Sequence, residues 1–450
     1  MTTLRFHDAL KQAAQSLRNL LEQKALPAEP AVRVVRDLYG CLRYAVNVPR
    51  DEFPGPAREA LQAAQTALGP YATSAEVLFR DSFVSPDKFF KQPHWLRTTV
   101  AMGSNDEGDA LPSFEVVLLD RMVTGQDWLQ PVHSSEKHPH RVVFYGLKGG
   151  VGRSTALCMV AWGLARQGKR VLLVDFDLES PGLSGLILPQ ERIAEFGVTD
   201  WLVEDSVSQG DSVLPHMVSA SPLGETTQGA VRVAAAMGQG EIDYLAKLSR
   251  VYADVPSEHG PQRLGERLRR MVLALEQREQ PDVVLIDSRA GLHDLAAAAI
   301  TGLADTALLF ATDGEQTWQG YRQLFSHWQK RPTVVREVRE RLAIVRALTP
   351  KIDREGGVKR FQRKAYELFA ETLYDAIPQG AADAEGDYFH PIEADEAAPH
   401  FPILVDWDEQ FQEFNPSLRP EAGGVTDARV DATFGALIQW VSQRIQDEQA

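Results

Sequence analysis

The feature that most constrains the fold of this chain is a glycine-rich segment that joins two apolar runs. Val142–Tyr145 has the composition of a short buried strand, and it leads into the segment Gly146-Leu-Lys-Gly-Gly-Val-Gly-Arg-Ser-Thr155. Over Leu157–Leu164, apolar residues then recur at three- and four-residue steps, as on one face of a helix. A strand, a glycine turn and a helix in this order are the context that a phosphate-binding loop requires.

The residue types in this loop suit an anion that carries several charges. Gly149, Gly150 and Gly152 permit a tight turn that directs successive backbone N–H groups inward, because glycine adopts positive φ angles without strain. The N-terminus of the following helix adds a partial positive charge at the same place. We therefore expect the phosphates of a nucleotide to bind here. The expected binding residues are Lys148, Gly149, Gly150, Val151, Gly152, Arg153, Ser154 and Thr155.

After residue 141, short β-rich runs alternate with helical stretches. This alternation predicts βαβ crossovers, and hence an α/β fold with a mostly parallel sheet covered by helices. Asp287 ends one of the runs, at a position from which a carboxylate can hold a magnesium-bound water beside Ser154. The predicted strands are residues 142–145, 171–175, 231–236, 283–287, 306–310 and 342–345.

A lysine directly before the paired glycines narrows the type of loop. With Lys148 in that place, the segment resembles the deviant Walker A motif of the ParA/MinD class of P-loop ATPases, in its KGGVGR variant. The family motif ends in lysine followed by serine or threonine, whereas this chain has Arg153 before Ser154. The resemblance extends over residues 141–347, and it implies a P-loop NTPase fold that binds ATP and Mg²⁺.

Two further segments carry the resemblance. Residues 171–182 resemble the second strand and first switch of the family, which implies that Asp177 polarises the attacking water and that Asp175 lies near the metal. Residues 283–293 resemble the Walker B strand and second switch, although Ser288-Arg289-Ala290 departs from the family pattern there. That departure leaves the partner contacts of the switch open. The expected metal-site residues are Ser154, Asp175 and Asp287, and the expected catalytic residues are Lys148 and Asp177.

Arg153 is the sharpest departure from the family motif. Arginine is a planar fork that can bind phosphate through two N–H groups but cannot occupy the place of a compact lysine. We therefore expect nucleotide binding to survive and hydrolysis, if present, to be slow. The resemblance implies that Lys148 reaches the phosphates of the partner subunit in a nucleotide-sandwiched homodimer. Arg346 and Ala347 stand near the place of the adenine-contacting asparagine of the family, so the choice between adenine and guanine stays open.

The charge distribution limits the kinds of partner. Acidic residues outnumber basic ones by 62 to 47, and the net charge of −15 argues against a surface that coats DNA or anionic lipid. Residues 330–364 carry twelve Lys or Arg against four acids, and residues 365–418 carry thirteen acids and no Lys or Arg. Contact with nucleic acid is therefore expected only through a local patch at 330–364. Two cysteines, no signal-peptide pattern and no run of eighteen apolar residues predict a cytoplasmic protein without membrane insertion.

We expect four regions along the chain. Apolar residues at helical steps before Ala25, over Val32–Leu42 and over Ala57–Leu68 predict a helical N-terminal module at 1–72. A mixed segment at 73–140 connects this module to the ParA/MinD-like nucleotide-binding domain at 141–350. The C-terminal extension 351–450, with its acidic segment 365–418, is expected to complete or cover that domain.

Two classes of function remain open at this stage. The first is a slowly hydrolysing, dimeric ATPase switch that acts on a protein partner, for example in a bacterial multigene defence or signalling system. The second is an interaction scaffold that binds nucleotide without hydrolysing it, and Arg153 is its main support. A DNA or plasmid partition ATPase is a minor alternative. A tyrosine kinase of the same P-loop class is disfavoured, because the C-terminal segment lacks a tyrosine cluster.

Overall fold

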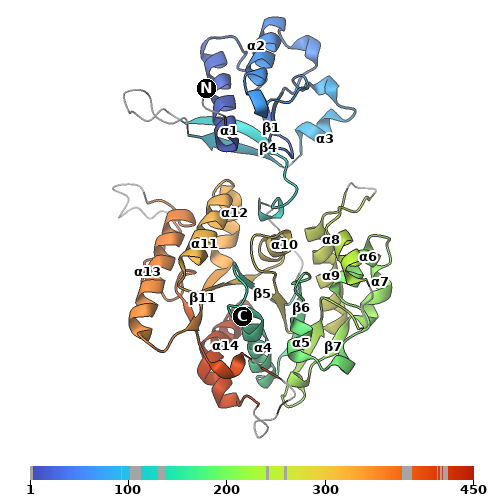
Figure 1. Cartoon of the computed structure of the whole chain (residues 1–450), viewed down its shortest axis with the longest axis vertical. Coiled ribbons are helices and arrows are strands. Elements are labelled where there is room, and N and C mark those ends of the chain that lie inside the picture. Colours follow the sequence, from blue (N-terminus) through green and yellow to red (C-terminus); the bar gives the residue numbers. More distant parts are fainter. Residues whose placement is uncertain are drawn as a thin grey trace. The chain divides into compact units, whose positions relative to one another are not determined.

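The chain forms two compact units, Met1–Val123 and Thr124–Ala450. The structure, a computed structural model, describes residues 4–92, 94–101, 113–129, 137–239, 243–257, 261–377, 388–412, 414–415, 418 and 424–449. Figure 1 shows the elements of both units, coloured along the sequence.

The first unit combines helices with a four-stranded sheet. The strand order is β2-β1-β4-β3, with β1 parallel to β4 and the other two pairs antiparallel. Apolar side chains of α1 and α2 pack with those of β1, β2 and β4 in one core. Its main elements are α1 (Phe6–Glu22), β1 (Arg33–Arg36), β2 (Leu42–Ala45), α2 (Gly55–Thr66), α3 (Pro86–Phe90), β3 (Trp95–Val100) and β4 (Phe114–Asp120).

The helix predicted over Val32–Leu42 is wrong, because this stretch forms the hairpin of β1 and β2. The Asp37 side chain accepts hydrogen bonds from the backbone N–H groups of Tyr39 and Cys41, and Gly40 adopts a φ of +85°. Both features stabilise a tight turn and end a helix. The first region is therefore a mixed α/β module rather than a helical one, whereas the first and third predicted helices correspond to α1 and α2.

The boundary between the units also differs from the expected one. The connecting segment was placed at 73–140, but its strands β3 and β4 pair within the sheet of the first unit. The first unit accordingly extends to Val123. A polar stretch near 132–140 suggested the later boundary, and residues 130–136 of it lie outside the described residues.

The second unit contains an eight-stranded sheet in the order β12-β11-β10-β5-β9-β6-β8-β7. Every neighbouring pair is parallel except β7 and β8, as the alternating pattern predicted. The strands are β5 (His140–Gly146), β6 (Arg170–Asp175), β7 (Val218–Ala220), β8 (Ala230–Ala234), β9 (Val283–Asp287), β10 (Thr306–Ala311), β11 (Leu342–Thr349) and β12 (Ile403–Asp406).

Helices cover both faces of this sheet. One core cluster joins the sheet to α6, α9, α10, α11, α12 and α13, and a second joins it to α4, α5 and α14. Figure 1 shows α4 and α14 side by side, and residues of the two helices are in contact. The helices are α4 (Arg153–Arg166), α5 (Leu183–Ile187), α6 (Val198–Asp205), α7 (Gly210–Val213), α8 (Tyr244–Val251), α9 (Leu264–Glu279), α10 (Asp294–Gly302), α11 (Glu315–Trp328), α12 (Pro332–Val338), α13 (Arg354–Thr372) and α14 (Asp427–Gln449).

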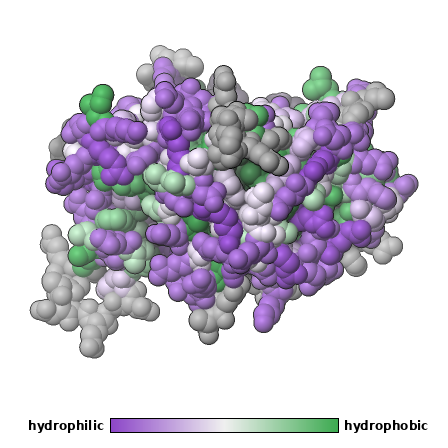
Figure 2. Space-filling view, turned by 90° about the horizontal axis from the view of Figure 1, so that it is seen from below, coloured by the Kyte–Doolittle hydropathy of each residue, from purple (hydrophilic) through white to green (hydrophobic). Residues whose placement is uncertain are grey.

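Close packing fixes α4 against α14. A Cβ atom added to Gly163 of α4 would lie 2.6 Å from Cγ2 of Ile438 on α14, so the two helices approach closely at this glycine. The helix that begins at the glycine-rich loop is thereby held between the sheet and the last helix. On the face drawn in Figure 2, hydrophilic side chains predominate and hydrophobic ones form small separate patches. Among the described residues, no helix is both long and apolar enough to cross a bilayer.

Candidate functional site

The glycine-rich loop lies between the buried strand β5 and the first turn of α4. Gly150 and Gly152 adopt φ angles of +75° and +73°, a backbone conformation that residues other than glycine rarely adopt. Lys148, Gly149 and Gly150 are exposed, whereas Arg153 begins α4 and is buried. The loop therefore has the backbone geometry expected of an anion-binding turn at a helix N-terminus.

Two buried carboxylates lie beside this loop. β6 and β9 are parallel neighbours, and Asp175 at the end of β6 pairs in register with Asp287 at the end of β9. Both side chains are almost fully inaccessible to solvent. Asp175 accepts hydrogen bonds from the backbone N–H groups of Asp177 (2.9 Å) and Leu183 (3.3 Å). The loop after β6 is thus folded around the Asp175 carboxylate.

Arg153 turns inward and bridges two of the predicted acidic residues. Its Nε donates to Oδ1 of Asp287 at 2.7 Å, and its Nη2 donates to Oδ2 of Asp177 at 3.1 Å. The Arg153 side chain is only 8% exposed, so both ion pairs are largely shielded from water. Arg153 is therefore paired with Asp177, in the loop after β6, and with Asp287, the last residue of β9.

The electrostatics of the group follow from burial and from this bridge. Burial raises the pKa of Asp175 well above its ordinary value, and the neighbouring Asp287 adds to the effect. Burial also raises the pKa of Asp287, but Arg153 and a hydrogen bond from the Ser154 side chain oppose that rise. Burial alone would lower the pKa of Arg153, yet the two carboxylates raise it above its usual range. Arg153 therefore stays charged and is the cation of the cluster.

The structure brings most of the predicted site residues together. Arg153, Ser154 and the three acidic residues Asp175, Asp177 and Asp287 form one connected group at the ends of β5, β6 and β9. Lys148 is not part of this group. Its Nζ instead donates to the side chain of Gln316 in the first turn of α11, on the exposed side of the loop.

The residues present are compatible with Mg²⁺ bound together with phosphate. Ser154 and Asp287 supply oxygen atoms, which Mg²⁺ prefers, and the Ser154 side chain lies close enough to Asp287 to lower the pKa of its carboxyl group. Within the described ranges, no three His, Cys, Asp or Glu side chains form a metal-binding group by themselves. A few protein oxygens plus phosphate oxygens are the usual surroundings of Mg²⁺.

Comparison with known proteins identifies the family. The sequence model of the CbiA family, described as the CobQ/CobB/MinD/ParA nucleotide binding domain, matches residues 142–370, just over half of the chain. The chain belongs to this family. The family fold is the parallel sheet with flanking helices described above, so the predicted α/β class and the ParA/MinD resemblance are both confirmed.

Individual relatives match smaller parts or match more distantly. The chromosome-partitioning ATPase Soj of Thermus thermophilus is 48% identical over 52 residues, which cover 12% of this chain and 21% of that protein. The chain thus spans about a fifth of the length of this curated relative.

Two solved structures of related proteins have low overall similarity. The structure of pNOB8 ParA bound to nonspecific DNA has a TM-score of 0.41 and 18% identity, over 69% of this chain and 99% of that one. A cobyrinic acid a,c-diamide synthase of Mycobacterium smegmatis, with bound ATP analog and magnesium, has a TM-score of 0.35 and 19% identity. That match covers 48% of this chain and 77% of the other.

A second ionic group in this CobQ/CobB/MinD/ParA domain was missed by sequence reasoning. Glu179, in the loop after β6, forms an ion pair with Arg289 in the loop after β9. It also accepts a hydrogen bond from the Tyr252 hydroxyl, and its Oε1 lies 3.4 Å from Nε2 of His293. Arg289 lies in the Ser288-Arg289-Ala290 stretch that departs from the family pattern, and this departure was the one available signal.

The region expected to face the base differs from the family pattern in a specific way. Leu348 of β11 lies beside the loop, since a Cβ added to Gly152 would be 3.4 Å from its Cδ2. Arg346 is buried, its Cζ lies 5.6 Å from the centre of the Phe361 ring, and its Nη1 has no hydrogen-bond partner among the described residues. An arginine thus stands near this end of β11, where the family pattern has an amide.

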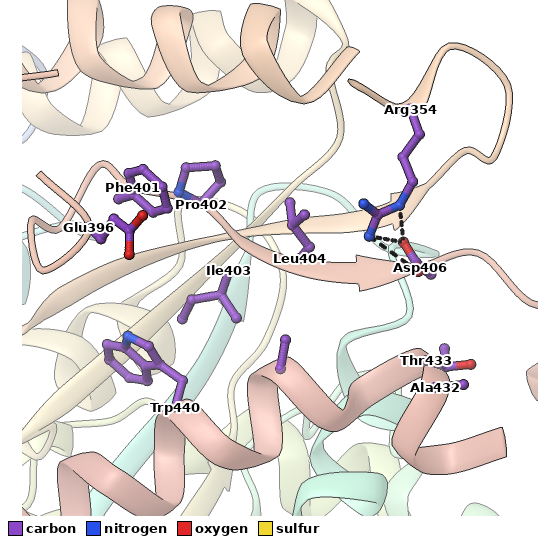
Figure 3. A pocket seen from close by; sticks show the side chains of 11 residues that line it. Arg354, Glu396, Phe401, Pro402, Ile403, Leu404, Asp406, Ala432, Thr433 and Trp440 are labelled. Atoms are coloured by element: carbon purple, nitrogen blue, oxygen red, sulfur yellow. Dashed lines mark hydrogen bonds and ion pairs between the residues drawn. The ribbon is translucent and has the colours of Figure 1, made fainter. Parts of the chain in front are cut away.

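A separate groove lies at the edge of the sheet. It has a volume of about 350 Å³ and is bounded by edge strand β12 and helix α14 (Figure 3). At one end, Arg354 forms an ion pair with Asp406. None of the predicted nucleotide-site residues lines this groove, so it is distinct from the phosphate loop.

Half of the twelve cations in the basic stretch 330–364 have an acidic partner within the fold. Two more donate hydrogen bonds to backbone carbonyls of the second unit. The contacts are Arg331 with Leu129 O, Arg339 with Asp375, Arg341 with Ala304 O, Arg354 with Asp406, Lys359 with Glu355, Arg360 with Asp353, Arg363 with Glu367 and Lys364 with Asp313.

Proposed function

We propose that this chain is a nucleotide-dependent switch that binds ATP and Mg²⁺ at residues 148–155 and acts on a protein partner in the cytoplasm. The observation that carries the proposal is the joining of the loop to the ends of β6 and β9 through Arg153 and Ser154. A change of ligand at the loop would therefore act directly on Asp177 and Asp287, and through them on the two loops that follow these strands.

In this proposal each residue has a defined task. The backbone N–H groups of the loop and the N-terminus of α4 hold the phosphates. Ser154 and Asp287 would hold Mg²⁺, which supplies charge stabilisation for phosphoryl transfer. Asp175 lies beside Asp287 on the neighbouring strand and would add a carboxylate near the metal. Asp177 would orient the attacking water once Arg153 no longer binds it.

Nucleotide binding is tested by substitution in the loop. Gly152→Val places a β-branched residue at a φ of +73° and next to Leu348, and Ser154→Ala removes the hydroxyl beside Asp287. We expect both to weaken ATP binding, measured by calorimetry with Mg²⁺, by at least about tenfold. Ser249→Ala on α8 is a matched control, because the exposed Ser249 hydroxyl contacts only its own helix. Unchanged ATP affinity in both loop variants would refute the placement.

A specific observation favours the second candidate function, a scaffold that binds nucleotide without hydrolysing it. Asp177, the expected water-orienting residue, is engaged by Arg153 in this structure. A phosphate-release assay separates the two candidates. For the ATPase, Asp177→Ala should lower turnover at least about tenfold, or 1.4 kcal/mol in the barrier. Absence of phosphate release from the parent protein, together with tight ATP binding, would favour the scaffold.

We further propose that ATP closes a homodimer in which Lys148 contacts the nucleotide of the partner subunit. In support, Lys148 is exposed and its Nζ does not join the Asp177–Asp287 group. Opposed nucleotides at a two-fold interface each need a nearby cation to offset desolvation. Lys148→Ala should reduce ATP-dependent dimerisation in sedimentation experiments more than it reduces ATP binding. Lys359→Ala, which removes an exposed ammonium from α13, is the control.

A protein partner is favoured over DNA as the object of the switch. The net charge is −15, and half of the twelve cations in the basic stretch 330–364 are paired with acidic side chains within the fold. Strong binding to nonspecific DNA requires unpaired cations that can replace counterions on phosphates. DNA binding remains the minor alternative, because partition proteins are among the relatives. It would be favoured if the ATP-bound protein shifted duplex DNA in a gel-shift assay at physiological salt.

A further inference from the structure

The orientation of Arg153 carries a consequence beyond nucleotide binding. Its guanidinium is buried between Oδ1 of Asp287 (2.7 Å) and Oδ2 of Asp177 (3.1 Å), at the inner side of the first turn of α4. An arginine that serves only to bind phosphate has no need of two carboxylate partners. In this conformation the guanidinium is committed to the protein's own acids.

The carboxylates of this group need a positive charge in order to remain buried. Asp175 and Asp287 are 0% and 1% exposed and lie in register on neighbouring strands, and the Asp177 side chain is 16% exposed. A buried carboxylate without a cation is strongly destabilising. Arg153 supplies one charge to this group. The oxygen atoms of this group also suit a divalent cation, which would be attracted to the same Asp287 carboxylate as Arg153.

We infer that Arg153 is an internal competitor of the divalent cation. In the nucleotide-free protein it neutralises Asp287 and Asp177, and it moves to the nucleotide phosphates only when Mg²⁺ takes over their compensation. The inference rests on the proposed function, and it adds that Mg²⁺ and nucleotide bind as one strongly coupled event. Mg²⁺ alone meets carboxylates that are already paired, and nucleotide alone would leave them unpaired.

The first test measures the coupling without relying on turnover. ATP affinity is determined by calorimetry with Mg²⁺ and again with EDTA, for the parent and for Asp177→Asn. The parent should bind ATP at least about tenfold more tightly with Mg²⁺, within the usual range of coupling between two ligands. In Asp177→Asn, Arg153 has lost one of its two anchors, so ATP binding in EDTA should strengthen and the effect of Mg²⁺ should shrink. Asp282→Asn removes the same charge from an exposed ion pair with Arg170 and should behave like the parent.

The second test uses Mn²⁺ as a probe of the nucleotide-free site. Arg153→Gln frees the carboxylates, so it should bind Mn²⁺ at least about tenfold more tightly than the parent, as measured by electron paramagnetic resonance of free Mn²⁺. The inference fails if the parent binds ATP equally well with Mg²⁺ and with EDTA, or if Asp177→Asn keeps the Mg²⁺ effect of the parent. It also fails if a folded Arg153→Gln variant binds Mn²⁺ no better than the parent. Absence of ATP binding under every condition would overturn the proposed function itself.

Discussion

Glu179 and Arg289 form an ion pair that ties the loop after β6 to the loop after β9. Both loops begin next to the carboxylates that Arg153 bridges, so Asp177 and Glu179 hold the loops at two successive points. Tyr252 and His293 add contacts to the same Glu179 carboxylate. These contacts therefore link the two loops to each other at the ends of the strands.

Glu179→Gln should loosen this link between the loops. The substitution keeps the size of the side chain but removes the charge that pairs with Arg289 and accepts a hydrogen bond from Tyr252, and hydrogen bonds to charged groups contribute about 1.5–3 kcal/mol. Amide hydrogen exchange over residues 288–293 should become at least about tenfold faster, as measured by mass spectrometry. Glu225→Gln breaks the exposed pair with Arg192 and should leave that exchange unchanged. Equal protection in Glu179→Gln and the parent would show that the pair does not hold the loop.

Glu276→Gln should destabilise the second unit. Glu276 of α9 accepts two hydrogen bonds, both of 2.7 Å, from Arg141 at the start of β5, and both side chains are at most 4% exposed. Loss of one partner leaves a buried charge uncompensated, which costs about 3–5 kcal/mol. Denaturant unfolding measures the effect. Glu367→Gln removes an exposed pair with Arg363, and its free energy of unfolding should change by less than about 1 kcal/mol.

Gly163→Ala should separate the effect of close packing from helix propensity. The new Cβ would lie 2.6 Å from Ile438, so α4 and α14 must move apart, and we expect a loss of about 1–3 kcal/mol. Gly435→Ala on α14 is the matched control, because its Cβ would meet no atom within 4 Å. That variant should be more stable than the parent by up to about 1 kcal/mol. A gain in thermal stability from both substitutions would contradict the packing argument.

Because Asp127 ionises, the free energy of unfolding should fall as the pH rises from about 4 to 6. Burial, together with the nearby Asp294, raises the pKa of Asp127 from 3.8 to about 6. The folded protein therefore binds a proton that the unfolded chain has released, so this residue opposes folding above pH 6 by about 3 kcal/mol. Asp127→Asn should raise the free energy of unfolding at pH 7 and have little effect at pH 4. Asp211→Asn, at an exposed position, should alter neither value.

The sequence was sufficient to predict those elements for which a single structural requirement determines the residue types. The run of glycines predicted a turn in which Gly150 and Gly152 do adopt positive φ angles, and the apolar runs predicted the strands β6 and β9, which end at Asp175 and Asp287. The sequence was misleading over Val32–Leu42, because spacing that fits a helix also fits two short strands around a turn. The hydrogen bonds of Asp37 and the positive φ of Gly40 produce the turn between the two strands.

Other features depend on three-dimensional contacts that residue spacing does not contain. The position of Arg153 in the motif suggested contact with phosphate, and its rotamer instead follows from the two carboxylates around it. The short edge strands β7 and β12 were also not predicted, because three or four residues carry too little periodicity. Glu179 became significant only once the fold brought Arg289 and Tyr252 to it.

The packing of α14 on α4 has a consequence for biosynthesis. On the ribosome, the phosphate loop and α4 emerge long before Ile438 has been translated, so the apolar side of α4 that faces Ile438 stays uncovered in the nascent chain. We expect the loop to acquire its final anchoring only after α14 has left the exit tunnel. An incomplete chain that stalls before α14 would then lack the contact of Gly163 with Ile438 that holds α4, the helix that begins at the glycine-rich loop.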